Sequence, residues 1–295
     1  MKDYAIIVDS TADLTKELRT KYDISYVQMA IIVEGKEFPA SLDWDFYSPQ
    51  DLYGWMRNKK IIKTSQVSYL GFKDAFEKCL NEGKDVLYIA CSSALSGSIN
   101  LGRKIALELM EKYEGSKIVC VDSLISCMGQ GILAIKASEN RKNGMNLEDN
   151  VKWIEDNKLK SNQIASVESL DYLARAGRVK ASKAFFGNLF GIKPILISDV
   201  NGNNFAFKKV KGRINSINYL VDFIKENIID SEDQIIYVSH GDDIETAKHI
   251  KEKILKEIKC KDVYINYLGP IIGSSTGPGT IGIYFMGKEV TISGE

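Results

Sequence analysis

Serine, threonine and glycine residues collect in three short segments, and each segment borders an apolar run of the sequence. The segments are Thr64-Ser65-Gln66, SSALSGS at 92–98 and GSSTGPGT at 273–280. Loops that leave the carboxyl ends of parallel strands are common ligand sites in α/β proteins. A helix that begins at such a loop offers free N–H groups to an anion, and hydroxyls add neutral donors. The segments therefore suit a carboxylate or a phosphate.

A simpler role has to be weighed for each segment. Thr64 and Ser65 precede a helical pattern at 68–80, where capping of that helix is the favoured interpretation. The 92–98 segment holds four serines, although a cap needs only one hydroxyl, and there an anion site is favoured. The 273–280 segment alone is explained equally well as a tight turn that needs glycine. Three such segments in one chain favour a binding site.

Acid–base groups are scarce around these segments. The chain has no GxxxxGK[ST] phosphate loop and no GxSxG elbow, and its two histidines, His240 and His249, lie elsewhere. We expect His240 to be structural, and Asp9 either binds a hydroxyl or a metal ion or caps a helix. Five widely spaced cysteines without a CxxC pair predict small core residues rather than disulfides or zinc. Many donors with little acid–base chemistry favour binding over catalysis, and we expect neither a metal nor a cofactor.

The pattern of apolar residues predicts the elements that position these segments. In the first half, apolar runs at 5–9, 86–91 and 117–123 are too short for helices and suit buried strands. They alternate with helical patterns at 68–80, 98–113 and 127–142, which predicts a parallel sheet with helices on both sides. The second half is mixed: a strand at 163–169, a hairpin at 193–210 that turns at Asn201-Gly202-Asn203, further strands at 234–240 and 262–268, helices at 215–228 and 244–258, and a closing apolar run at 281–287.

The predicted fold class is α/β with two domains, a parallel-sheet domain over 1–160 and a mixed α+β domain over 161–295, packed closely with a cleft between them. The 39 basic and 39 acidic residues cancel, so no charge excess points to nucleic acid. No apolar stretch is long enough to cross a bilayer, and the N-terminus lacks the pattern of a signal peptide. We therefore expect a cytoplasmic protein.

Six motifs together resemble the DegV family, in the order in which that family carries them. They are VDSTADL (8–14), TSQ (64–66), SSALSGS (92–98), DS (122–123), LDYLARAGRV (170–179) and LGPIIGSSTGPGTIGI (268–283). The resemblance runs nearly from end to end, and the ordered set is far more specific than any single motif. It implies a two-domain protein that buries a long-chain fatty acid, such as palmitate or oleate, with the carboxylate near the domain junction.

The resemblance also implies which hydroxyls hold the carboxylate. By motif these are Thr64 and Ser96, with Ser65, Ser93 and Ser275 as further candidates. Many family members carry a histidine at the position of Ser275. A hydroxyl there can donate one hydrogen bond but cannot carry a positive charge. We therefore expect anchoring to rest more on Thr64, Ser96 and backbone N–H groups.

Some family members work with a separate ATP-dependent fatty acid kinase, which phosphorylates the presented carboxylate and feeds the acyl phosphate into phospholipid synthesis. The resemblance implies such a partner here. Arg178 is a candidate for the head group or for the kinase interface. A basic stretch later in the chain is usually a solvated face, and a second hypothesis docks it against an acidic surface of the kinase. The stretch consists of Lys208, Lys209, Lys211 and Arg213. Tunnel-lining candidates, which ordinary core packing explains equally well, are Phe185, Phe186, Leu189 and Phe190.

Two other functions stay open at this point. The first is an enzyme, a small-molecule phosphotransferase or hydrolase that uses the serine segments and Asp9. The second is a regulatory protein in which lipid occupancy alters a contact with a partner.

Overall fold

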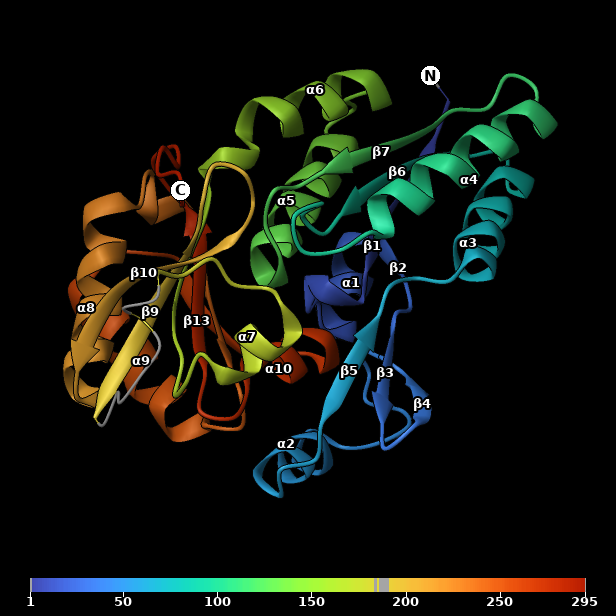
Figure 1. Ribbon diagram of the computed structural model, residues 1–295. Coiled ribbons are helices and arrows are strands. Elements are labelled where there is room, and N and C mark those ends of the chain that lie inside the picture. The colour runs from blue at the N-terminus through green and yellow to red at the C-terminus, as the bar shows by residue number, and fades with distance from the viewer. Residues whose placement is uncertain (1, 183–184, 186–190, 295) are drawn as a thin grey trace.

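The computed structural model describes residues 2–182, 185 and 191–294, and their strands form three sheets (Figure 1). The first sheet is parallel throughout and has the order β2-β1-β6-β7. Its strands are β1 (Tyr4–Asp9), β2 (Ile24–Val27), β6 (Asp85–Ala90) and β7 (Ile118–Asp122). The parallel sheet predicted for the first half is confirmed.

Helices cover both faces of this sheet, as the alternating pattern predicted. One face packs against α3 (Tyr69–Asn81) and α4 (Ser98–Lys112). The other packs against α1 (Lys16–Tyr22), α5 (Cys127–Lys142) and α6 (Leu147–Asn157). Ser68 caps α3, because its hydroxyl accepts a hydrogen bond from the N–H of Gly71 at 3.0 Å.

A small antiparallel sheet was not predicted. It has the order β4-β3-β5 and lies below the parallel sheet in Figure 1. Its strands are β3 (Ala30–Val33), β4 (Lys36–Pro39) and β5 (Ile62–Ser65), and α2 (Pro49–Arg57) stands between β4 and β5 in the chain. Strands of four residues carry too few side chains for a clear alternation, and β5 holds a single apolar residue, Ile62.

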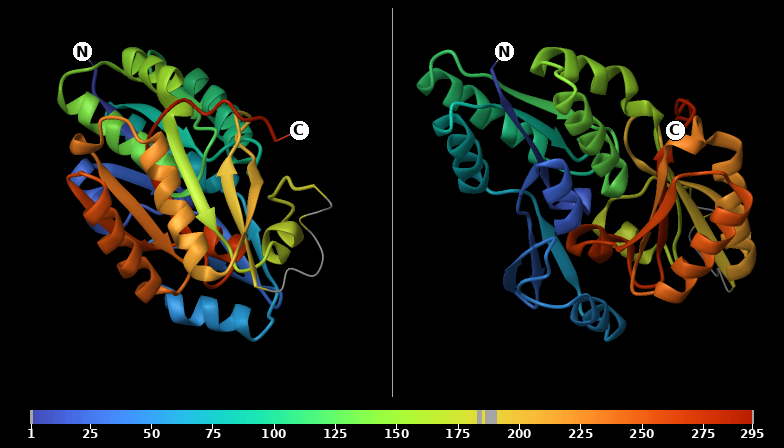
Figure 2. Two further views of the ribbon diagram at one scale, coloured as in Figure 1. Left: turned by 90° about the vertical axis from the view of Figure 1, so that its left-hand side faces the viewer. Right: turned by 180° about the vertical axis from the view of Figure 1, so that it is seen from behind.

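The third sheet is mixed and has the order β10-β9-β8-β13-β11-β12. Its strands are β8 (Ser161–Ser166), β9 (Ile192–Ser198), β10 (Asn204–Lys211), β11 (Ile235–His240), β12 (Asp262–Tyr267) and β13 (Ile281–Met286). Only β11 and β12 pair in parallel. Helices α8 (Arg213–Asn227) and α9 (Ile244–Glu257) cover its outer face (Figure 2). The mixed second domain is therefore confirmed.

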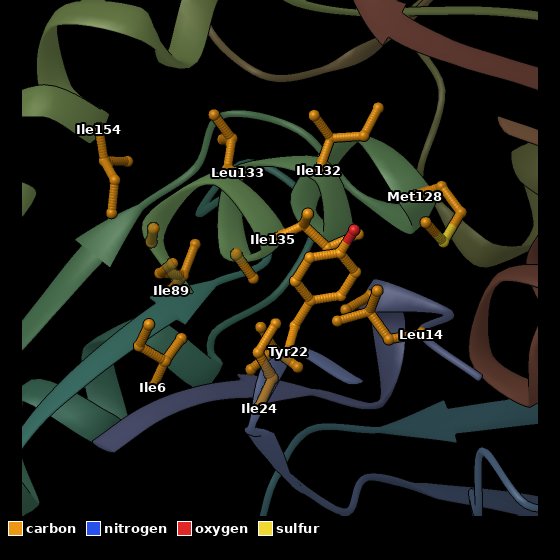
Figure 3. Close-up of a cluster of buried hydrophobic side chains, with 14 of the residues drawn as sticks. Ile6, Leu14, Tyr22, Ile24, Ile89, Met128, Ile132, Leu133, Ile135 and Ile154 are labelled. Carbon is orange, nitrogen blue, oxygen red and sulfur yellow. The ribbon is translucent and has the colours of Figure 1, made fainter. Parts of the chain in front are cut away.

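Helix α5 packs against both large sheets. Buried residues occur on all sides of it, and its apolar side chains form one cluster with the parallel sheet and with Tyr237 and Tyr284 of the mixed sheet. Figure 3 shows Met128, Ile132 and Ile135 of α5 against side chains of the first half. A helix buried on every side is expected to lack a polar stripe.

Two short helices lie where the halves of the chain meet: α7 (Asp171–Ala176) and α10 (Pro270–Thr276) (Figure 1). Helix α10 packs against α2, β3 and β5, although it belongs to the second half of the sequence. The strands of the two large sheets separate near residue 160, but the predicted domain ranges 1–160 and 161–295 stay predictions. No described helix is long and apolar enough to cross a membrane.

The predicted hairpin is confirmed, and its turn joins the two halves. Asp199 fixes the turn, because its carboxylate accepts hydrogen bonds from the N–H groups of Asn201 at 3.0 Å and Asn203 at 2.8 Å. Gly202 has a φ of +76°. A Cβ atom at this position would collide with the Ser92 hydroxyl and lie 3.0 Å from the carbonyl oxygen of Leu124. The turn thus packs directly on the first half.

Gly202→Ala should destabilise the protein by more than the cost of its backbone conformation. A left-handed conformation costs an L-residue about 1–2 kcal/mol, and the collision adds to this. Gly115→Ala is the matched control, since Gly115 has a φ of +77° and open space around it. Urea unfolding of both variants measures the difference. Equal losses would contradict the close packing of the turn.

Candidate functional site

A cavity of about 170 Å³ lies where the three hydroxyl segments meet. Thr64 of β5, Ser96 of the loop between β6 and α4, and Ser275 of α10 all line it. A single water needs only about 10–15 Å³, so the cavity is large enough for a larger ligand. The apolar part of its wall comes from both halves of the chain: Met29, Cys91, Leu95, Ala165, Leu173, Leu196, Leu268, Ile271 and Ile272.

Thr64 lies in strand β5, so the interpretation of this residue as a helix cap is wrong. Thr64 pairs with Ile31 in the small sheet, and neighbouring residues of a strand point to opposite faces. Thr64 lines the cavity, whereas Ser65 lines a separate surface groove with Tyr26 and Gln66. No described residue forms a hydrogen bond with the Thr64 hydroxyl, which therefore remains available to a ligand.

Ser96 is held by the fold of its own loop. The N–H of Ser96 donates to the carbonyl of Ser92 at 3.0 Å, and the Ser96 hydroxyl donates to the hydroxyl of Ser98 at 3.0 Å. That proton can rotate towards an anion in the cavity without moving the backbone. Ser93 does not line the cavity: it is exposed, and its N–H lies 3.2 Å from the carboxylate of Asp122.

Ser275 belongs to a helix rather than to the glycine-rich turn that the sequence predicted. Its hydroxyl donates to the carbonyl of Ile271 at 3.0 Å, and the Thr276 hydroxyl does the same to Ile272 at 2.9 Å. Such bonds to the carbonyl four residues earlier are common for hydroxyl residues in helices. The Ser275 proton is therefore already engaged, which leaves Thr64 and Ser96 as the better donors.

Arg178 brings a positive charge to the same cavity. Its side chain reaches across from the second half, and its Nε donates to the carbonyl of Leu95 at 2.9 Å. Nη1 donates to the carbonyl of Ala176 at 2.6 Å. The sequence left the place of Arg178 open. The structure puts it beside the loop of residues 92–98 between β6 and α4, which we call the serine loop.

Asp9 fixes the neighbouring edge of the parallel sheet. It caps the short turn Ser10–Ala12 by accepting from the N–H of Thr11 at 3.0 Å. It also accepts from the Tyr88 hydroxyl at 2.7 Å and the N–H of Cys91 at 3.1 Å. The Thr11 hydroxyl donates to Asp9 as well, and Thr11 lines the cavity. Both the cap and the hydroxyl contact predicted for Asp9 are present.

Asp13 is a buried acid that the sequence analysis did not single out. The Cys127 thiol donates to its carboxylate at 2.9 Å, and Asn266 donates to its backbone carbonyl at 2.9 Å. Burial raises the pKa of Asp13 from 3.8 to about 7. The cluster joins the first half to β12 and lies next to Tyr284, which lines the cavity.

Phe185 and Arg213, two other candidates from the sequence, do not line the cavity. Phe185 packs against the small buried cluster that includes Leu173, and Phe186, Leu189 and Phe190 fall outside the described residues. In the basic stretch, Arg213 forms an ion pair with Asp243 at 2.7 Å. This ion pair leaves Arg213 poorly placed to dock a partner.

His240 is buried, as expected for a structural histidine. Its ring packs against that of Tyr267, tilted and with the centroids 4.3 Å apart. Its Nδ1 accepts from the N–H of Asp243 at 3.2 Å, and burial lowers its pKa. It does not line the cavity. Among the described residues, no group of three or more histidine, cysteine or acidic side chains is arranged to hold a metal ion.

The family model described as "Uncharacterised protein, DegV family" matches residues 3–288. The chain belongs to the DegV family. A DegV domain-containing protein of Clostridium perfringens is 36% identical over 97% of this chain and 98% of its own length.

Solved DegV structures share the fold. A DegV lipid-binding protein of Thermotoga maritima is 28% identical, with a TM-score of 0.85, and the match covers 99% of this chain and 100% of that one. DegV of Bacillus subtilis, described as a fatty acid binding protein, is 27% identical with a TM-score of 0.82, over 96% of this chain and 99% of that one.

Asp13→Asn should change how stability depends on pH. The pKa of Asp13 is raised on folding, so the unfolded chain ionises near pH 4 while the folded chain keeps its proton until about pH 7. Wild-type stability therefore falls across this interval, by up to about 4 kcal/mol. The variant lacks this loss, so its stability relative to wild type should rise from pH 4 to pH 7.

Urea unfolding at several pH values measures this difference, and Asp74→Asn on the exposed surface of α3 is the control. A stability difference between wild type and Asp13→Asn that stayed constant with pH would contradict the raised pKa.

Proposed function

We propose that this protein binds a long-chain fatty acid, such as palmitate or oleate, in the cavity between its two halves. The carboxylate lies against the hydroxyls of Thr64 and Ser96. The observation that carries the proposal is the unpartnered Thr64 hydroxyl, which faces a cavity that also holds the rotatable Ser96 hydroxyl and an apolar wall. The names of the Thermotoga maritima and Bacillus subtilis relatives support it.

Apolar contact supplies most of the proposed affinity. Burial of an acyl chain contributes about 0.8 kcal/mol for each CH₂ group, so a long chain binds tightly even when its head group is held by few bonds. The hydroxyls then fix the direction in which the chain enters. A neutral anchor is enough for that role, provided the carboxylate keeps hydrogen-bond partners.

Arg178 offsets the absence of a histidine at position 275. Its guanidinium is positively charged, and it lines the cavity together with Thr64 and Ser96. The charge of the carboxylate is therefore balanced from the second half of the chain. Ser275 contributes less, because its proton is bonded to Ile271.

Replacing Thr64 and Ser96 together by alanine should weaken palmitate binding about tenfold or more, since each hydroxyl gives a hydrogen bond to a charged group. Methyl palmitate separates head group from tail. Wild type should bind palmitate more tightly than the ester, and the double variant should lose most of this preference. Fluorescent fatty acid displacement measures both affinities.

Ser93→Ala is the control, because Ser93 is exposed and outside the cavity. An unchanged preference in the double variant would show that the head group lies elsewhere. If neither palmitate nor its ester bound the wild-type protein, the proposed function itself would be wrong.

We further propose that the protein presents the carboxylate to a fatty acid kinase in the cytoplasm, for acyl phosphate formation in phospholipid synthesis. A second hollow of about 270 Å³ adjoins the cavity and shares Thr64, Arg178 and Ser275 with it. Lys60, Lys63 and Arg175 also line this hollow, and no acidic residue is among its described lining residues. A positive rim of this kind suits the phosphate groups that a kinase must bring to the carboxylate. In this scheme the partner supplies the catalysis.

Charge reversal at Lys63 and Arg175 should lower kinase-dependent acyl phosphate formation and leave palmitate affinity nearly unchanged. The reason is that both residues line the hollow but not the cavity. An assay with a fatty acid kinase, ATP and the loaded protein measures the rate. Lys104→Glu on the exposed surface of α4 is the control. A rate equal to that of wild type would rule out this role for the hollow.

A further inference from the structure

Three polar side chains converge on the cavity from elements that carry none of the proposed carboxylate ligands. They are Ser126, which immediately precedes α5, Gln163 of β8 and Tyr284 of β13. Their exposed fractions are 4%, 6% and 3%. Each is therefore nearly removed from bulk water, and each lines the cavity. Polar groups buried to this degree normally have hydrogen-bond partners.

The sheet register places these groups together. Gln163 and Tyr284 are direct partners in the antiparallel pairing of β8 with β13, so their side chains stand side by side on one face of the mixed sheet. Tyr284 contacts the thiol of Cys127, the residue next to Ser126. A Cβ atom at position 282 would lie 2.5 Å from the Tyr284 hydroxyl, so Gly282 leaves room for the phenol to lie along the sheet.

The hydrogen bonds around Gln163 leave one of its atoms without a partner. Asn204 is oriented by its side-chain N–H, which donates to the carbonyl of Arg178 at 3.1 Å. Its oxygen therefore accepts from the side-chain N–H of Gln163 at 2.8 Å. This arrangement fixes the Gln163 amide and leaves its oxygen as an acceptor without a described partner.

The other two groups are also poorly matched. The Ser126 hydroxyl forms no capping hydrogen bond and has no described partner. Among the described residues, the Tyr284 hydroxyl has a hydrogen-bond partner only in the Cys127 sulfur, which is a weak acceptor. A bare methylene chain lying over these three groups would leave them unsatisfied. Each unsatisfied group would weaken binding by about 5- to 150-fold.

We propose that Ser126, Gln163 and Tyr284 form a second polar subsite that binds a hydroxyl group on the acyl chain, so that the preferred ligand is a hydroxylated long-chain fatty acid. The ligand hydroxyl donates to the free oxygen of Gln163 and accepts from Ser126 or Tyr284. The inference rests on the proposed function, since it assumes that a fatty acid occupies the cavity. It adds a substrate class that the carboxylate anchor alone does not define.

Competition binding against a fluorescent fatty acid tests the subsite in the wild-type protein. The probes are stearic acid and three hydroxystearic acids, with the hydroxyl near the carboxylate, in mid-chain and near the methyl end. At least one hydroxystearate should bind about tenfold more tightly than stearate. If stearate bound as tightly as all three, the cavity groups would be satisfied by water and the proposal would be wrong.

Two variants test which residues cause the preference for a hydroxystearate over stearate. Gln163→Met and Ser126→Ala should each reduce it several-fold and leave stearate affinity unchanged or improved, whereas Ser93→Ala should change neither value. A preference that survived in both variants would overturn the assignment to these residues. Failure of every probe, stearate included, to bind would instead show that the proposed fatty acid function is wrong, and this inference would fall with it.

Discussion

The packing of α5 between the two large sheets is the constraint on which the rest of the structure depends. One helix supplies apolar side chains to the parallel sheet on one side and to Tyr237 and Tyr284 of the mixed sheet on the other. The two halves of the chain therefore share one apolar core around α5. The cavity lies beside the beginning of this helix, where polar residues such as Ser126 replace the apolar ones. The proposed ligand site lies at this junction, where the shared core ends.

Hydrogen bonds to Asp9 extend this constraint to the serine loop. A carboxylate without exposure to solvent has to be fully partnered, and Asp9 is partnered by Thr11, Tyr88 and Cys91. These contacts tie the carboxyl end of β1 to the carboxyl end of β6, from which the serine loop departs. The Ser96 hydroxyl is thus positioned by bonds that do not involve the ligand. Preorganisation of this kind lowers the entropy lost when a carboxylate binds.

The sequence predicted the large elements well because their patterns are long. Strands β1, β6 and β7, helices α3, α4 and α5, and the hairpin at Asn201-Gly202-Asn203 each carry a clear period or turn signal. Strand β2 and helix α6 were not predicted. The small sheet was missed because four-residue strands give no such signal. Helix α10 was taken for a turn because glycine and serine are weak helix formers, and only its packing against α2 and β5 explains why it forms.

The site was predictable only in part, for a related reason. Thr64, Ser96 and Ser275 stand in conspicuous clusters of hydroxyl residues, so their convergence could be anticipated. Gln163 lies among other polar residues of β8, whereas Tyr284 stands in the apolar strand β13. Nothing in either local sequence distinguishes a cavity wall from a sheet surface. Strand register places both side chains at the cavity, and this register pairs residues more than a hundred positions apart. The sequence analysis also missed Asp13. Burial raises the pKa of this residue, and no short motif predicts that burial.

The groups that would contact a carboxylate at the junction come from both halves of the chain. The hydroxyl donors come from the first half, while Arg178 comes from the second and is bonded to the backbone of the serine loop through Leu95. A carboxylate held at this point therefore contacts both halves at once. Because the cationic group and the neutral donors sit on different elements, ligand binding and the closeness of the two halves must favour each other. A fatty acid in this cavity would reinforce the same interface that α5 holds together.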